Sequence, residues 1–133
     1  MVLAAARWLA GLNALYEVVV GALSLAAPRA AGAVYRLAPA DLSDTALALT
    51  RIVGGLMVAH GLALALFARD PAKVPSLAPV LLVGAAANLL AAVVPCAVGE
   101  LAWSQLAGSL TFQGLLVLTL AAYSVRPRPE TGL

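Results

Sequence analysis

The stretch LNALYEVVVGALSL, residues 12–25, decides the fold and poses the main question about this chain. It belongs to an apolar run long enough to cross a bilayer, whose hydrocarbon core takes about 20 residues of helix. Glu17 nevertheless lies near the middle of that run. An ionisable residue inside a membrane span is costly, and it indicates a functional site with a nearby partner. The rest of the sequence has to supply that partner.

The composition is that of a membrane protein. Of the 133 residues, 63% are hydrophobic and 11% are charged, whereas soluble domains average about 45–50% and about 25%. The basic residues are scattered, so we do not expect nucleic acid as a partner. The expected partners are membrane lipids. Cys96 is the only cysteine, and no Cys/His spacing typical of a metal site occurs. We therefore expect no bound metal.

Four segments have the length and apolarity of membrane spans, roughly 3–26, 45–68, 77–98 and 100–123. Pro28 closes the first, the cap-like SDT at 43–45 opens the second, and the third ends near Gly99. Glu100 would suit the first turn of the fourth segment, because a negative charge is stabilising at the N-terminal end of a helix. We predict an all-α, integral-membrane, antiparallel four-helix bundle. It forms a single domain over residues 1–125, followed by a short disordered tail at 126–133.

The distribution of Lys and Arg predicts the orientation. One side holds five basic residues (Arg7, Arg69, Lys73, Arg126 and Arg128), and the other holds two (Arg29 and Arg36). Both termini are therefore expected in the cytoplasm, with the chain as a multi-pass protein of the bacterial inner membrane. The long connection at 28–43 either contains a short interfacial helix over AAGAVYRLA or is an irregular loop.

Polar residues recur at helical spacing within the spans. The stripes are Asn13, Glu17, Gly21 and Ser24; Arg51, Gly55, Val58 and Leu62; Gly84, Asn88, Ala91 and Pro95; and Gln105, Ser109 and Gln113. At 1.5 Å per residue, Glu17, Arg51 and Asn88 fall about 10–15 Å from the outer ends of their spans. Four such stripes predict one interior pocket.

Within this pocket we expect Glu17 to pair with Arg51, because neither charge is tolerable alone in hydrocarbon. The pair is either a structural clasp or a catalytic unit in which Glu17 acts as base or acid. Asn13, Asn88, Gln105 and Gln113 are the candidate substrate-binding residues. Trp103 either walls the mouth of the pocket or belongs to the interfacial aromatic belt. His60 lies about 180° around the helix from Arg51 and is expected to face away, toward a neighbouring helix or an oligomer seam.

GALSLAAP (21–28) and RIVGGLMVAHGLAL (51–64) resemble the DoxX-like small four-helix bacterial membrane proteins. The matching residues are Gly21, Pro28, Arg51, Gly54, Gly55 and Gly61. The resemblance covers about half the chain and implies the four-helix fold. The group's roles include redox-linked accessory subunits and membrane components of metabolic clusters, but this chain lacks a cysteine pair. The small multidrug exporters also have four spans and a glutamate in the first, but Arg51 would oppose binding of cationic drugs.

Three functions follow as hypotheses. The first is a cofactor-free acid/base enzyme of isomerase or cyclase type, acting on a lipophilic small molecule such as a terpenoid. No nucleotide, haem or metal motif occurs, which favours chemistry without a cofactor. The second is a non-enzymatic DoxX-like accessory or assembly protein. The third is a small proton-coupled transporter, for which a homodimer would form the pathway.

Overall fold

The computed structural model describes residues 2–34 and 43–125, and the regular structure in these ranges is helical. The helices are α1 (Val2–Ala26), α2 (Pro28–Val34), α3 (Asp44–Arg69), α4 (Leu77–Ala97) and α5 (Trp103–Ser124). All except α2 are long and apolar enough to cross a membrane. The four predicted spans are therefore confirmed as helices. The predicted tail at 126–133 lies outside the described residues.

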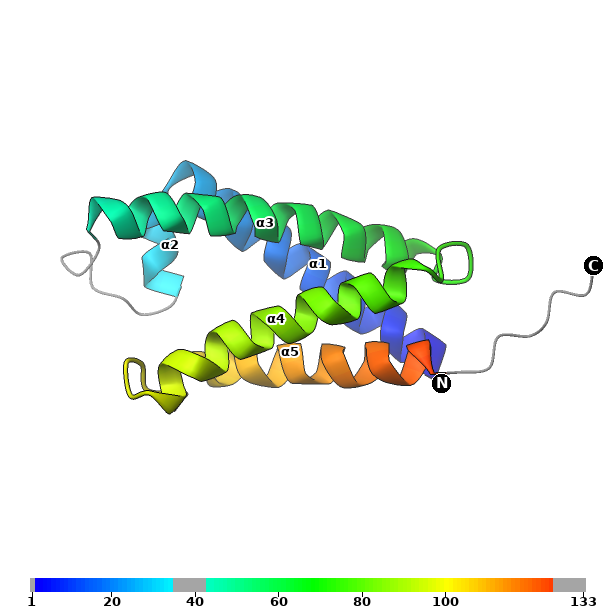
Figure 1. Cartoon of the computed structure of the whole chain (residues 1–133). Coiled ribbons are helices and arrows are strands. Elements are labelled where there is room, and N and C mark those ends of the chain that lie inside the picture. Colours follow the sequence, from blue (N-terminus) through cyan, green and yellow to red (C-terminus); the bar gives the residue numbers. More distant parts are fainter. Residues whose placement is uncertain (1, 35–42, 126–133) are drawn as a thin grey trace, which may run out of the picture.

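The four long helices form two antiparallel pairs. α1 packs along α3, α4 packs along α5, and α1 also contacts α5. Figure 1 shows that the start of α1, the α3–α4 connection and the end of α5 lie at one end of the bundle. We call this the terminal end. α2 and the α4–α5 turn lie at the other end, which we call the distal end.

The helix ends follow local chemistry. The Ser43 hydroxyl accepts a hydrogen bond from the Ala46 amide at 3.2 Å, which confirms the predicted cap of α3. Pro28 opens α2, since a proline at the first helical position needs no hydrogen-bond partner for its nitrogen. Gly99 follows α4 with φ +81°, a conformation that glycine adopts without strain. Glu100 lies in the α4–α5 turn, so its predicted place in a first helical turn is wrong.

Glycines set the packing of α1 on α3. A Cβ on Gly54 would lie 2.7 Å from both the Gly21 carbonyl oxygen and the Ser24 Cβ. A Cβ on Gly61 would lie 3.1 Å from both the Ala14 carbonyl oxygen and the Glu17 Cβ. The two backbones approach this closely only because these positions lack side chains. This register places Gly54 opposite Gly21 and Gly61 opposite Glu17.

The interior has three layers along the bundle axis. The terminal half is an apolar core of small and large side chains, formed by Ala6, Ala10, Ala14, Leu64, Phe67, Ala78, Leu81, Ala85, Leu116 and Leu120. The middle layer is polar, and the distal half contains a cavity. At the base of the core, Phe67 and Tyr123 meet edge to face at 5.3 Å, and the Tyr123 hydroxyl donates to the Pro71 carbonyl at 2.9 Å.

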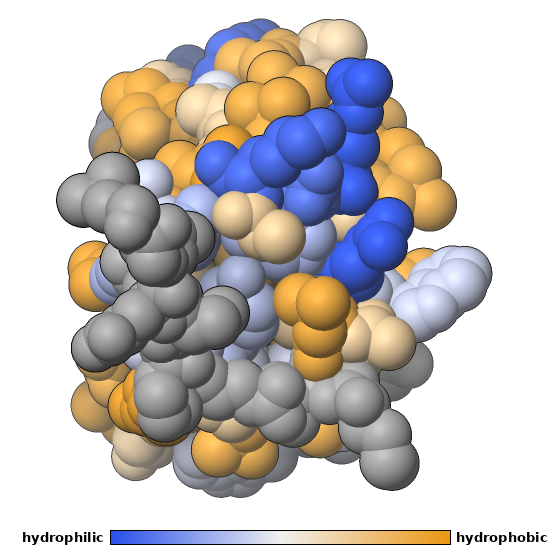
Figure 2. Space-filling model, turned by 90° about the vertical axis from the view of Figure 1, so that its right-hand side faces the viewer, coloured by the Kyte–Doolittle hydropathy of each residue, from blue (hydrophilic) through white to orange (hydrophobic). Residues whose placement is uncertain are grey.

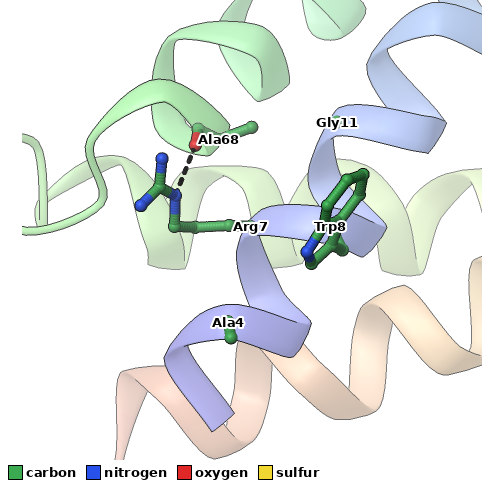
Figure 3. Close-up of a pocket in the computed structure, with 5 residues that line it drawn as sticks. All are labelled: Ala4, Arg7, Trp8, Gly11 and Ala68. Atoms are coloured by element: carbon green, nitrogen blue, oxygen red, sulfur yellow. Dashed lines mark hydrogen bonds between the residues drawn. The ribbon is translucent and has the colours of Figure 1, made fainter. Parts of the chain in front are cut away.

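The terminal end carries a cluster of hydrophilic residues surrounded by hydrophobic surface (Figure 2). Arg7 donates from Nε to the Ala68 carbonyl at 3.1 Å (Figure 3). It also donates from Nη2 to the Arg69 carbonyl at 3.2 Å, so it caps the end of α3. Lys73 lies 3.2 Å from Asp70, and its ammonium holds the pKa of that carboxyl below its usual value.

Candidate functional site

Glu17 lies at the centre of the polar middle layer, on α1, which packs against α3 and α5; α4 reaches it through the side chain of Asn88. Its side chain is fully buried, with 0% exposure. The predicted stripe of α1 is confirmed, because Asn13, Gly21 and Ser24 are buried with it. The carboxylate contacts one polar side chain from each of α3, α4 and α5. One buried acid therefore joins the four long helices.

The partner from α3 is His60. Its Nδ1 lies 2.6 Å from Glu17 Oε2, which is the distance of a strong, charge-assisted hydrogen bond. The other ring nitrogen, Nε2, is buried beside Gly84 of α4 and makes no hydrogen bond within the described part of the chain. A Cβ on Gly84 would lie 2.6 Å from Nε2. Gly84 therefore makes the space that the imidazole ring occupies.

The partners from α4 and α5 are amides. Asn88 Nδ2 and Gln113 Nε2 each lie 3.4 Å from Glu17 Oε1 and donate to it. At this length the two hydrogen bonds are weak. The two oxygens of the carboxylate thus have different roles, since Oε2 binds the histidine and Oε1 faces the two amides.

Asn88 and Gln113 also form the polar wall of a cavity of about 260 Å³ in the distal half of the bundle. The wall is otherwise mostly apolar. The full lining is Tyr16, Val53, Met57, Asn88, Ala91, Ala92, Pro95, Leu101, Leu106, Ser109 and Gln113. Of the predicted polar faces of the third and fourth spans, Asn88, Ala91, Pro95, Ser109 and Gln113 line this space, whereas Gly84 does not. Two amides consequently separate the cavity from Glu17.

The predicted pair of Glu17 with Arg51 is wrong. Arg51 is exposed, while Glu17 is buried and bound to His60. The glycine register explains the difference, because it places Glu17 opposite Gly61 rather than opposite the start of α3. Arg51 precedes His60 by nine residues, or about 13 Å along the helix, toward the distal end.

The inward face predicted for the second span is wrong for the same reason. Arg51 and Leu62 are exposed, whereas His60 faces away from Arg51 as predicted and, of the two alternatives, binds a neighbouring helix through Glu17 on α1. A signal for the correct face was present in the sequence. Val53, Met57, His60, Leu64 and Phe67 recur at i, i+4, i+7, i+11 and i+14, an apolar helical stripe that contains the histidine.

Two of the remaining predicted binding residues lie away from the cavity, and the side chain of the third is not among those that the structure describes. Asn13 is buried one turn nearer the terminal end, where Nδ2 donates to the Leu9 carbonyl at 3.1 Å and Oδ1 makes no hydrogen bond within the described residues. Trp103 is 53% exposed and is not among the lining residues, so it does not wall the cavity. The side chain of Gln105 lies outside what the structure describes.

Comparisons with protein-family models, with curated proteins and with solved structures found no match. The resemblance to the DoxX-like group accordingly stays a prediction, and the function is argued from the site alone.

The arrangement suits the storage of one proton. In a buried, low-dielectric interior a net charge is costly, so the Glu17–His60 pair is expected to stay neutral overall. Two forms satisfy this condition: a carboxylate with an imidazolium, or a carboxylic acid with a neutral imidazole. Both hold one exchangeable proton in the 2.6 Å hydrogen bond. The pair can therefore give or take a proton next to an apolar cavity.

Proposed function

We propose that this chain is a multi-pass membrane protein that binds a lipophilic small molecule and exchanges a proton with it through Glu17 and His60. In this proposal it is a cofactor-free enzyme of isomerase or cyclase type. One observation carries the proposal: Asn88 and Gln113 line the cavity and also bind Glu17 Oε1. A ligand in contact with these amides lies one residue away from the proton-holding pair.

Glu17 Oε1 is the atom best suited to reach a ligand. His60 occupies Oε2, whereas Oε1 is held only by two weak hydrogen bonds at 3.4 Å. Catalytic hydrogen bonds are often long before substrate binds. When a ligand separates the two amides, Oε1 takes a proton from one carbon of the ligand, and the pair returns a proton to another carbon. Such a step moves a double bond and needs no other reactant.

We also place the chain in the bacterial inner membrane, with both termini in the cytoplasm. The support comes from charge, because the start of α1 with Arg7 and the α3–α4 connection with Arg69 and Lys73 lie at the terminal end (Figure 1). Cytoplasmic connections of membrane proteins carry an excess of Lys and Arg. Arg126 and Arg128 belong to the same side by sequence and lie outside the described residues.

A second candidate is a non-enzymatic accessory or assembly protein of the DoxX-like kind. The observation that favours it is the position of Glu17, which contacts side chains from all three other long helices and is not itself a lining residue of the cavity. A cluster of this kind would fix the four helices in one arrangement without any chemistry. In that case Glu17 would matter for folding and for partner binding only.

Deuterium incorporation tests the enzymatic proposal without a known substrate. Purified protein in lipid nanodiscs is incubated in D₂O with a hydrophobic extract of bacterial membranes, and the lipophilic compounds are then analysed by mass spectrometry. We expect one compound to gain deuterium with the wild-type protein and with Glu100→Gln, whose glutamate is exposed in the α4–α5 turn. Glu17→Gln should abolish the gain. If no compound gains deuterium in a Glu17-dependent way, the enzymatic proposal is wrong.

A further inference from the structure

We propose that the ligand of the distal cavity is an uncharged, apolar molecule with one hydroxyl or similar hydrogen-bond donor, and that Gln113 Oε1 accepts this hydrogen bond. The inference rests on the proposed function in one respect, namely that the distal cavity is a ligand site. It adds the chemical class of the ligand and the residue that selects it.

The first step concerns the orientation of the Gln113 amide. Its Nε2 donates to Glu17 Oε1, and a carboxylate oxygen facing two amides accepts but does not donate. The amide must therefore turn its NH₂ group toward Glu17 and its carbonyl oxygen away. The orientation of Gln113 is thus determined by chemistry.

The second step concerns the missing hydrogen-bond partner of the Gln113 carbonyl oxygen. Gln113 is 5% exposed, and its Oε1 is buried with no hydrogen-bond partner in the described part of the chain. A buried acceptor left without a donor costs about 1–3 kcal/mol. The same residue lines the cavity. A donor on a bound ligand would supply the missing hydrogen bond once the Gln113 side chain shifts to open this oxygen to the cavity.

The third step concerns the rest of the ligand. None of the described residues that line the cavity is charged, and most are apolar. Because the Glu17–His60 pair beside the cavity is neutral overall, a ligand charge would be desolvated there without a net counter-charge, which is strongly unfavourable. The volume of about 260 Å³ lies just below the range of about 300–1,000 Å³ for sites of drug-sized ligands. The ligand is therefore small and neutral, with an apolar body.

The fourth step concerns entry. Two lining residues, Val53 on α3 and Ala91 on α4, are exposed on the apolar outer surface. Figure 1 shows α3 and α4 close together near their connection and diverging toward the distal end. Because the two exposed lining residues lie on α3 and α4, we place the mouth of the cavity between these helices, facing the hydrocarbon phase. A neutral alcohol dissolved in the bilayer reaches the cavity without crossing a polar barrier.

Photolabelling of the wild-type protein in nanodiscs tests this inference. The probes are a medium-chain alkanol that carries a diazirine, its methyl ether and the matching alkylammonium, and labelled positions are mapped by mass spectrometry. We expect the alkanol to label cavity-lining peptides about tenfold more than the ether, which is the factor that one hydrogen bond contributes. The ammonium should label them least. Equal labelling by alkanol and ether, or preferential labelling by the ammonium, overturns the inference.

Variants on α5 locate the acceptor. Gln113→Met should reduce alkanol labelling to the level of the ether, because it removes the acceptor and preserves an unbranched side chain. Thr111→Val is the matched control, since Thr111 is exposed and its hydroxyl donates to the Ala107 carbonyl at 2.9 Å. It should leave the preference intact. A preference that survives Gln113→Met contradicts the assignment. The wild-type comparison decides the ligand class even where that variant fails to fold.

Failure of this inference is distinguishable from failure of the proposed function. Alkanol selectivity in a protein that shows no Glu17-dependent deuterium incorporation would support a binding protein and not an enzyme. Deuterium incorporation without alkanol selectivity would retain the enzyme and remove the role of Gln113. Deuterium incorporation tests the role of Glu17, and photolabelling tests the role of Gln113 in the same site.

Discussion

His60 Nδ1 lies 2.6 Å from Glu17 Oε2, and this bond connects α1 to α3 where the two backbones are already held close by glycines. Gly61, the residue after His60, packs against Glu17 itself. The Glu17–His60 hydrogen bond and the glycine contact therefore depend on each other. Close packing fixes the depth of His60, and the bond to Glu17 stabilises the half-buried imidazole.

Removal of the histidine alone should be strongly destabilising. His60→Leu leaves Glu17 buried without its strongest partner, and breaking a buried pair from one side costs about 3–5 kcal/mol. Glu17→Gln/His60→Leu should recover most of this loss, because the glutamine carbonyl still accepts from Asn88 and Gln113. The free energy of unfolding in mixed micelles measures both variants. A double variant as unstable as the sum of the two single variants would contradict the pairing.

Adjacent glycines on α3 should respond in opposite ways to alanine. Gly54→Ala places a methyl group 2.7 Å from the Gly21 carbonyl oxygen, and overpacking of this kind costs about 1–3 kcal/mol. At Gly55 the nearest atom would be Leu25 Cδ2 at 3.9 Å, so Gly55→Ala should gain about 0.5–1 kcal/mol of helix stability. Thermal unfolding in detergent compares the two. Equal effects would show that α1 and α3 do not meet at Gly54.

Gly84 should control the position of the imidazole. Gly84→Ala brings a methyl group to 2.6 Å from His60 Nε2, so the ring has to move and the bond to Glu17 should lengthen or break. Gly108→Ala on α5 is the control, since no atom lies within 4 Å of the added methyl group. The histidine ¹⁵N NMR signals report the change. Unchanged signals in Gly84→Ala would place His60 elsewhere.

Arg7 should stabilise the terminal end through the backbone of α3. Arg7→Gln removes the guanidinium that binds the Ala68 and Arg69 carbonyls, with an expected loss on the order of 1 kcal/mol. Arg29→Gln on α2 removes an exposed arginine at the distal end and should change little. Hydrogen exchange of amides in the last turn of α3 should accelerate only in the first variant. Equal acceleration in both would argue against the cap.

The spans and their ends could be predicted from the sequence because they depend on local signals. Apolar length, the Ser43 cap and Gly99 act within a few residues, and the structure agrees with each of them. The stripe of Glu17 could be predicted as well, since buried polar residues at helical spacing define a face.

The partner of Glu17 could not be predicted, because it depends on the register between two helices. Distances counted from the ends of the spans predict the depth of a residue only where those ends lie level, and the ends of α1 and α3 do not. Gly21 and Gly54 set the offset between the two helices through a backbone contact that the sequence of one helix does not reveal. The charge of Arg51 favours the wrong face of α3, whereas the stripe that runs from Val53 through His60 to Phe67 marks the correct one.

The ¹⁵N NMR spectrum of the histidine tests the central pairing most directly. The chain contains a single histidine, so ¹⁵N-histidine labelling in nanodiscs, with an affinity tag free of histidine, gives signals from His60 alone. We predict that Glu17→Gln shifts the Nδ1 signal strongly, while Arg51→Met and Glu100→Gln leave it unchanged. An Nδ1 signal that stays constant in Glu17→Gln, or that moves with Arg51→Met, would contradict the Glu17–His60 pair.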